Sequence, residues 1–224
     1  MDKSKLAAAQ KALEFVKPGM SVGLGTGSTA EIFIDLLGKR EKEEKLGLAC
    51  IATSRASERQ AKRLGLKLAG FDAVEKLDAA FDGADQVDSD FNLIKGLGGA
   101  LVREKIVDYR AKEFYVLVGE GKLCDELSGI VPVEAIPMAE GAVRRELAAL
   151  GALEAPARME GKRKFISDNG NPVLHAKFGK IGDPAELEWR INEIPGVVDN
   201  GLFTKGASVA VIVGSASGTA RVLE

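Results

Sequence analysis

The feature that most constrains the fold is a regular alternation of short β-rich apolar runs with helical patterns, from Ser21 to about Gly129. The apolar runs are SVGLG, LACIAT, LKLAG, LDAAFD and FYVLVG, and the helical segments among them are Thr29 to Leu37, Ser54 to Leu64 and Gly99 to Arg110. Such alternation is typical of βαβ units with a mostly parallel sheet. Right-handed crossovers would cover both faces of this sheet, so we expect the loops at the carboxyl ends of its strands to form a ligand crevice.

The pattern changes near Val131, which indicates a second, smaller domain. Its expected elements are a strand at VPVEAIP, a helix from Ala139 to Leu150, a hairpin of Ala157 to Ile166 and Pro172 to Lys177 that turns at residues 168–171, a helix from Pro184 to Ile194, and a short strand at VVDNGLF. This βαββαβ order is the ferredoxin-like pattern. The final apolar run, ASVAVIVG, is expected to return to the first sheet as a strand buried on both faces.

The sequence therefore predicts an α/β protein with two domains. A Rossmann-like catalytic domain with a mostly parallel sheet would comprise residues 1–130 and 204–224. A smaller ferredoxin-like α+β domain, residues 131–203, would be inserted near the C-terminus.

Charge and cysteine content argue against several classes of function. The chain has 224 residues and a net charge of −2 at pH 7 with acids and bases interspersed, so no basic face for nucleic acid or an anionic membrane is expected. Its apolar runs are too short to span a bilayer. Cys50 and Cys124 form no CxxC pair and have no metal-ligand spacing, which favours two reduced thiols. The N-terminal segment has the pattern of an amphipathic helix that stops at Pro18-Gly19, so we expect a cytoplasmic protein.

A loop with three glycines and three hydroxyl residues follows the first predicted strand. Residues Gly25 to Ala30 fit GxGxxA, but the second predicted strand ends at Ile51 to Ser54 without the acid that a dinucleotide site places there. A P-loop fits no better, because no Lys follows the glycines. Free N–H groups at a helix N-terminus favour a phosphate or another oxyanion. The alternative is a tight turn in which Ser28 or Thr29 caps the helix.

The stretch DGADQVD, which begins at Asp82, places three acids and a glycine at and just after the end of the LDAAFD strand. Asp82 and Asp85 would lie at the carboxyl edge of the sheet, where ligands bind. Lys95 then leads a second glycine-rich turn, and Glu104 follows on a helix where it could face either the crevice or solvent. The alternative makes both acids turn or cap residues, and Glu104 half of a surface ion pair with a neighbour.

A calcium site is an alternative for the same stretch. Asp88-x-Asp90-x-Asn92 begins like an EF-hand loop. Leu93 occupies the obligatory glycine position and Gly99 the position of the bidentate Glu, so no metal site is predicted.

Four motifs, in their order and at their intervals, resemble the A-type ribose-5-phosphate isomerases: GTGSTA, DGADQVD, KGLGGALVREKI and GEGK. TSRASERQAKRLG, VPVEAIP, DNGNPVL and PGVVDNGLF are similar to segments of that family, so the resemblance covers nearly the whole chain. It implies interconversion of D-ribose 5-phosphate and D-ribulose 5-phosphate, in the non-oxidative pentose phosphate pathway and the Calvin cycle, without metal or organic cofactor. The partners would be the sugar phosphates and a second copy of the chain, as a homodimer or alternatively a homotetramer.

The resemblance also implies the site residues. Glu104 would be the catalytic base, and Asp82, Asp85 and Lys95 further catalytic residues. The implied substrate-binding positions are Thr26, Gly27, Ser28, Thr29, Gly83, Ala84, Gly96, Leu97, Gly98 and Lys122. One carboxylate can carry a proton between C1 and C2 through an enediolate. Lys95 and the amides of residues 96–99 would stabilise the enediolate oxygens, and the two aspartates would move protons among O1, O2 and the ring oxygen.

The chain departs from the family pattern at His175, its only histidine, where the family usually has Asp. We expect a hairpin side chain there, and Trp189 in the core or at a subunit interface. Three other functions are alternatives: a sugar-phosphate sensor of a transcription regulator, an amino-sugar-phosphate isomerase or deaminase, and a nicotinamide-dependent dehydrogenase. The residues before Ser21 leave no room for a helix-turn-helix, His175 is badly placed for ring opening, and the ribose acid is missing.

Overall fold

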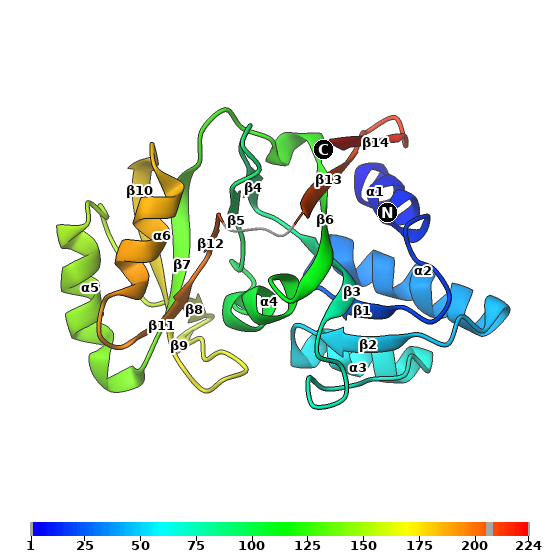
Figure 1. The fold of residues 1–224 in the computed structure, drawn as a ribbon. Coiled ribbons are helices and arrows are strands. Elements are labelled where there is room, and N and C mark those ends of the chain that lie inside the picture. The colour runs from blue at the N-terminus through cyan, green and yellow to red at the C-terminus, as the bar shows by residue number, and fades with distance from the viewer. Residues whose placement is uncertain (1, 205–207, 224) are drawn as a thin grey trace. The chain divides into compact units, whose positions relative to one another are not determined.

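The computed structural model describes residues 2–204 and 208–223, which form two compact units (Figure 1). Unit 1 comprises Met1–Ala84, Arg103–Lys122 and Gly206–Glu224, and unit 2 comprises Asp85–Val102 and Leu123–Lys205. Residues 85–102 and 123–130 thus group with unit 2, whereas the domain boundaries drawn from sequence place them in the first domain. Those boundaries, 1–130 plus 204–224 and 131–203, stay a prediction. No helix among the described residues is long and apolar enough to cross a membrane.

Unit 1 contains a six-stranded sheet in the order β14-β13-β6-β3-β1-β2. Its elements are α1 (Lys3–Leu13), β1 (Ser21–Leu24), α2 (Ser28–Glu44), β2 (Ala49–Ala52), α3 (Arg55–Leu64), β3 (Leu77–Gly83), β6 (Ala111–Gly119), the 3₁₀ helix η1 (Glu120–Lys122), β13 (Ser208–Gly214) and β14 (Ala220–Leu223). Helix α4 (Leu101–Asp108) begins in unit 2 and continues in unit 1. All neighbouring pairs are parallel except β13 with β14, so the predicted mostly parallel sheet is confirmed.

The strand order places a topological switch point at β1. The chain runs from β1 to β2 on one side and then to β3 on the other, so β1 lies between them. Leu24 at the end of β1 is in register with Phe81 of β3, and the loops after these two strands therefore start side by side. Ligands of open α/β sheets bind at such a point, outside the carboxyl ends of the strands. Strand β13 returns beside β6 (Figure 1).

Each face of this sheet is covered by helices. Helices α1, α2 and α3 pack on the face that carries Val22 and Phe81, and Phe33 of α2 stacks on Phe81 with ring centroids 4.5 Å apart. Side chains alternate along a strand, so Gly23 faces the other way. A Cβ on Gly23 would lie 2.7 Å from Cγ1 of Val107, which shows that α4 approaches that second face closely. Helices therefore lie on both faces, as the βαβ pattern predicts.

Two parts of unit 1 differ from the sequence-based expectation. The run LKLAG forms no strand: Leu68 makes only an isolated parallel bridge to Cys50, because the chain turns away at residues 71–73 after passing the edge of the sheet. Strand β14 was not predicted, since ARVL follows a hydroxyl-rich turn and is mostly half-buried at the sheet edge. The predicted last strand is confirmed as β13, although its first residue, Ala207, lies outside the described residues.

Unit 2 contains three small antiparallel sheets: β10-β7-β11, β12-β5-β4 and β8-β9. Its elements are β4 (Gln86–Val87), β5 (Leu93–Ile94), β7 (Ser128–Ala135), the 3₁₀ helix η2 (Pro137–Ala139), α5 (Glu140–Ala149), β8 (Met159–Glu160), β9 (Arg163–Lys164), β10 (Val173–Lys180), α6 (Pro184–Asn192), β11 (Val197–Asn200) and β12 (Leu202–Phe203). Residues of α5 and α6 share one apolar core with Val131, Val133 and Leu174.

The ferredoxin-like order of the elements is retained, but one of the predicted strands is reduced to isolated bridges. The predicted strand from Ala157 to Ile166 is interrupted, because residues 159–164 fold into the separate hairpin β8-β9, whereas Ile166 pairs with Pro172 across the predicted turn at residues 168–171. Glu154 and Ala157 instead make isolated antiparallel bridges to β10. Together with β10-β7-β11, these bridges place the second, third, first and fourth chain segments in that spatial order, as ferredoxin-like sheets do.

The predicted strand VVDNGLF is also divided. Its first part is β11 and its second part is β12, and these belong to different sheets. The side chain of Asn200 accepts a hydrogen bond from the N–H of Leu202, which turns the backbone at Gly201 between the two strands.

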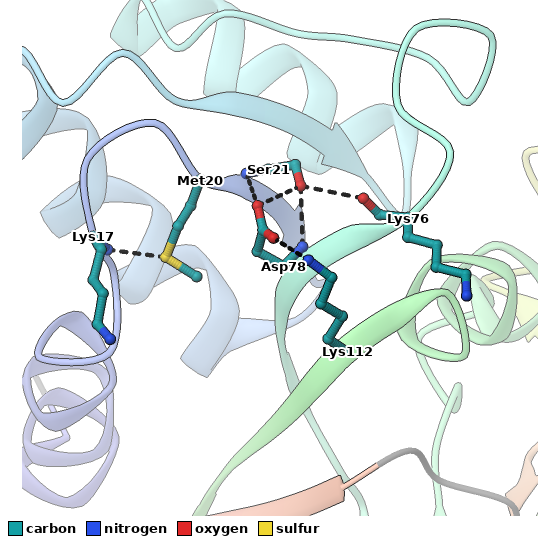
Figure 2. Close-up of polar contacts among 6 residues, drawn as sticks. All are labelled: Lys17, Met20, Ser21, Lys76, Asp78 and Lys112. Carbon is teal, nitrogen blue, oxygen red and sulfur yellow. Dashed lines mark hydrogen bonds and ion pairs between the residues drawn. The ribbon is translucent and has the colours of Figure 1, made fainter.

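A polar network ties together the amino ends of β1, β3 and β6 (Figure 2). Asp78 accepts hydrogen bonds from the backbone N–H and the hydroxyl of Ser21, both at 2.9 Å, and from Nζ of Lys112 at 2.8 Å. The Lys112 ammonium, followed by the Ser21 N–H, lowers the pKa of Asp78 to about 2. The network lies at the end of the sheet opposite the strand carboxyl ends, so it serves stability.

We predict that Asp78→Asn lowers the free energy of unfolding by about 1 kcal/mol at neutral pH, since it replaces a charge-assisted network at a partly exposed site. Because the folded pKa of about 2 lies below the ordinary 3.8, this contribution is present above pH 4 and is lost as pH falls toward 2. Urea unfolding at pH 7 and pH 2.5 measures it, with exposed Asp72→Asn as the control. A variant that differs equally from wild type at both pH values would contradict this account.

Candidate functional site

The first glycine loop of unit 1 joins β1 to α2. Helix α2 begins at Ser28, and its N-cap is Gly27, which has φ 106° and makes no side-chain capping bond. The alternative in which Ser28 or Thr29 caps the helix is therefore wrong. The first N–H groups of α2 remain uncapped by any side chain, and such groups attract anions at a helix N-terminus.

The hydroxyl of Thr26 fastens this loop to the loop between β2 and α3. Its Oγ1 lies 2.6 Å from Oγ1 of Thr53 and donates to Oγ of Ser54 at 2.8 Å. The Ser57 hydroxyl donates to the carbonyl of Gly25 at 2.5 Å. Sequence reasoning missed these three supporting residues. The available signal was their position, because hydroxyls follow the second strand where a dinucleotide fold would carry an acid.

Lys5 is a second residue that sequence reasoning missed. Its Nζ donates to Oγ of Ser28 at 2.9 Å, which brings a cation from α1 to the N-terminus of α2. Helix α1 is held there because Ser4 packs closely against Gly214 of β13 and Gly119 of β6. A Cβ on Gly214 would lie 1.9 Å from the carbonyl oxygen of Ser4, and one on Gly119 would lie 3.0 Å from Oγ of Ser4. The Lys5–Ser28 contact joins residues far apart in the chain, so no local sequence pattern predicts it.

Asp82 ends β3 and binds the glycine loop directly. Its Oδ1 accepts the N–H of Thr26 at 2.9 Å and the N–H of Gly83 at 2.7 Å, and the residue is fully buried. A Cβ on Gly25 would lie 2.2 Å from the same oxygen, so the loop reaches Asp82 only because Gly25 has no side chain. Thr26 and Asp82, both predicted site residues, are therefore brought together.

Glu104 lies on α4 and is 3% exposed, so its interpretation as half of a surface ion pair is wrong. Val107, one turn further along the helix, packs over Gly23 of β1 and Ala80 of β3. Glu104 shares that helix face and precedes Val107, which directs it toward the carboxyl ends of the same strands. The predicted Lys122 lies at the end of η1, exposed at the carboxyl end of β6, next in the sheet to β3.

Unit 2 contains the remaining predicted residues. The N–H of Asp85 donates to the carbonyl of Ile94 at 2.8 Å, and its carboxylate accepts the N–H of Leu97 at 3.2 Å. Gly96 has φ 83° and accepts the N–H of Gly99 at 2.8 Å, which closes the turn. Asp85 thus accepts a backbone N–H of the second glycine turn, as Asp82 accepts one of the first glycine loop.

Several residues discussed from sequence have other roles. Asp88 accepts the N–H groups of Asp90 and Asn92, which shapes the β4-β5 turn. Trp189 is 60% exposed, so the expectation of a core residue is wrong, while the interface stays a prediction. Burial, and then the charge of Arg158, lower the pKa of His175 on β10. Among residues 2–204 and 208–223, no three His, Cys, Asp or Glu side chains gather in a way that could hold a metal ion.

Comparison with known proteins identifies close relatives. The family model for ribose 5-phosphate isomerase A (phosphoriboisomerase A) matches residues 49–218. A ribose-5-phosphate isomerase A of Thermococcus kodakarensis is 44% identical over 99% of this chain and 98% of that protein. The solved ribose 5-phosphate isomerase A of Methanocaldococcus jannaschii has a TM-score of 0.92 at 44% identity, covering 98% and 97% of the two chains. A D-ribose-5-phosphate isomerase in complex with phospho-erythronic acid has a TM-score of 0.93 at 42% identity, with the same coverage.

We predict that Gly25→Ala destabilises the protein by about 1–3 kcal/mol, because the new methyl group would overlap the Asp82 carboxylate and backbone. Gly70→Ala is the matched control: nothing lies within 4 Å of a Cβ there, and a change below about 0.5 kcal/mol is expected. Urea unfolding of both variants is the measurement. Equal stabilities for the two would show that the loop tolerates displacement from Asp82.

Proposed function

We propose how the residues of this chain divide the catalytic work, on the premise that it belongs to the ribose 5-phosphate isomerase A family and is a ribose-5-phosphate isomerase. Its activity belongs to pentose phosphate metabolism. The observation that carries the proposal is the placement of a buried carboxylate, Glu104, on the helix that covers β1 and β3 near their carboxyl ends. The reaction needs one group that can take a proton from one sugar carbon and return it to the next.

Glu104 is proposed as that group. As a carboxylate it removes the proton from C2 of the open-chain aldose, and as a carboxylic acid it returns the proton to C1 of the resulting enediolate. Both transfers occur on one face of the sugar, so a single side chain suffices. Burial favours this role, because water that could exchange or misdirect the proton is excluded from a residue that is 3% exposed.

Lys95 and the second glycine turn are proposed to stabilise the enediolate oxygens. An ammonium group and backbone N–H groups are the donors that developing negative charge requires. The turn supplies N–H groups at Gly96 and Gly98, and the Leu97 N–H bond to Asp85 together with the closing hydrogen bond keeps the turn in a fixed arrangement. Fixed donors need no reorganisation while the charge develops, which is why they lower the barrier.

Asp82 and Asp85 are proposed to move protons among the sugar oxygens. The furanose ring must open before isomerisation, so one proton leaves the O1 hydroxyl and another reaches the ring oxygen. Each carboxylate accepts a backbone N–H from a glycine turn, so each is oriented by the turn it serves.

The phosphate of the sugar is proposed to bind at the N-terminus of α2. Gly27, Ser28 and Thr29 supply the N–H groups and hydroxyls, and Thr26 holds the loop in place through its bonds to Asp82 and Ser54. Lys5 adds a cation 2.9 Å from the Ser28 hydroxyl, and Lys122 is a further cation. Gly83 and Ala84 would contact the sugar through their backbone. A structurally similar protein was solved with phospho-erythronic acid, which supports a phosphorylated sugar as the ligand of this chain.

The homodimer expected from sequence stays a proposal, with a homotetramer as the alternative. It is supported by a groove of about 460 Å³ between α5 and α6 that is lined by Leu150, Ile194, Pro195 and the exposed ring of Trp189. Sedimentation velocity distinguishes a monomer, a dimer and a tetramer. The cytoplasmic location also stays a prediction.

We predict that Glu104→Gln lowers kcat at least about a hundredfold, because the amide cannot accept the C2 proton, while the substrate still binds. The measurement is ribulose 5-phosphate formation from ribose 5-phosphate with a chelator present. Glu43→Gln on the exposed side of α2 is the matched control and should keep the wild-type rate. An active Glu104→Gln would move the base to Asp82 or Asp85.

Lys5→Met should raise KM for ribose 5-phosphate roughly tenfold and change kcat little, because a remote phosphate contact contributes uniform binding energy. Lys3→Met, on an exposed position of the same helix, is the control. Steady-state kinetics of both variants provide the comparison. An unchanged KM in Lys5→Met would remove Lys5 from the phosphate site.

A further inference from the structure

The last residue of the second glycine turn, Gly99, is covered by two side chains from a later segment of unit 2. A Cβ on Gly99 would lie 2.3 Å from Cε1 of Phe165 and 2.4 Å from Nη1 of Arg158. All three residues belong to unit 2. Gly99 has φ 91°, so glycine is needed there both for the backbone conformation and for the close approach of the two side chains.

The two side chains stack on each other. Cζ of the Arg158 guanidinium lies over the ring of Phe165 at 3.8 Å from the ring centroid. A planar guanidinium stacks well on an aromatic face, and the attraction is stronger where water is excluded. Nη1 of Arg158 is buried and makes no hydrogen bond within residues 2–204 and 208–223. The stack with the ring therefore places this end of the guanidinium against Gly99.

The backbone that carries the pair is fixed to β10. The N–H of Arg158 donates to the carbonyl of Val173 at 2.8 Å, and the N–H of Phe165 donates to the carbonyl of Arg158 at 2.9 Å. The residues between them, 159–164, are exposed and contain the hairpin β8-β9. The pair thus occupies the base of this hairpin, and main-chain hydrogen bonds specify where its two side chains begin.

Phe165 also contacts the start of α4. It packs on a small apolar cluster that includes Leu101, the first residue of the helix that carries Glu104. A Cβ on Gly96 would lie 2.3 Å from Cβ of Leu101, so the turn and the start of the helix are packed together. Phe165 therefore touches the turn at Gly99 and the beginning of α4 at the same time.

A turn with three glycines needs support from outside to keep one shape. Gly96, Gly98 and Gly99 give the backbone large conformational freedom, and restricting it costs free energy. Two hydrogen bonds act on the turn: the N–H of Gly99 donates to the carbonyl of Gly96, and the N–H of Leu97 donates to Asp85. The first of these depends on the position of Gly99. Side chains packed on Gly99 therefore stabilise the closed turn.

We propose that Arg158 and Phe165 form a positioning pair that holds Gly99, and with it the second glycine turn, in the arrangement that the isomerase reaction needs. This inference rests on the role proposed above for that turn in stabilising the enediolate oxygens. The pair acts through the turn and does not touch the sugar. Negative charge on these oxygens is greatest after the first proton transfer has begun, so a loosened turn lowers kcat more than it raises KM.

The test removes the stack while it keeps most of the side-chain volume. Arg158→Met lacks the planar group, and Phe165→Leu lacks the ring. We expect each variant to lower kcat about tenfold with KM within about threefold, measured well below its melting temperature. The double variant should lose no more than about twofold beyond the less active single variant, because the two side chains act as a unit. Losses that multiply would contradict a pair.

Arg163→Met is the matched control. It makes the same exchange at an exposed position of the hairpin β8-β9 and should keep the wild-type kcat. Arg158→Lys keeps the charge without the plane and is expected to stay impaired, since an ammonium does not stack as a guanidinium does. A lysine variant with the wild-type kcat would overturn the stacked pair, because charge alone would then suffice.

Hydrogen exchange at the N–H of Gly99 reports the state of the turn independently of the reaction rate. We expect this amide to exchange about tenfold faster in Arg158→Met and in Phe165→Leu, because the turn opens more often when Gly99 is not covered. Arg163→Met should exchange as the wild type does. A lowered kcat with unchanged exchange at Gly99 would overturn the positioning role.

Lys95→Met separates this inference from the proposed function. If Lys95→Met keeps the wild-type kcat, the stabilisation of the enediolate by Lys95 and the turn fails, and the inference fails with it. If Lys95→Met is strongly impaired while Arg158→Met and Phe165→Leu keep the wild-type kcat, the proposed function stands and the positioning pair alone is overturned.

Discussion

The hydrogen bond from the N–H of Thr26 to the carboxylate of Asp82 is the contact on which the rest of unit 1 depends. It joins the loops after two adjacent parallel strands, and it forms only because Gly25 has no Cβ. The hydroxyls after β2 and the ammonium of Lys5 then attach to the same loop. Three segments that are distant in sequence thus meet at one turn, which leaves the N-terminus of α2 open for an anion.

Unit 2 contains the same kind of contact between an acid and a glycine turn, made by different residues. Asp85 accepts the N–H of Leu97 in the second glycine turn, as Asp82 accepts that of Thr26 in the first. Both turns are therefore oriented by acids from one four-residue stretch, DGAD. Burying Asp82, Lys95 and Glu104 costs stability, because charged groups lose hydration. The apolar core within each unit offsets this cost.

Local patterns predicted the elements whose environment is uniform. Central residues of strands β1, β3 and β6, namely Val22, Ala80 and Val116, are apolar because both faces of the sheet are covered. Helix α3 has a serine N-cap and a left-handed glycine at its end. Prediction failed where long-range packing decides the outcome. LKLAG has the composition of a strand, yet it meets only one residue of the sheet edge. VVDNGLF was expected as one strand, but a side-chain bond of Asn200 divides it between two sheets.

The sequence by itself determined the chemistry of the site. It shows the acids, the lysines, the glycine turns and their order along the chain, and each of these residue types has few functions at the end of a strand. It also determined the parallel sheet, through the period of its apolar runs. Only the tertiary structure decided that Glu104 is buried, that Lys5 and the hydroxyls after β2 support the first loop, and that Arg158 and Phe165 cover Gly99. These contacts join residues that have no fixed spacing in the chain, so their geometry exists only once strands and helices have packed.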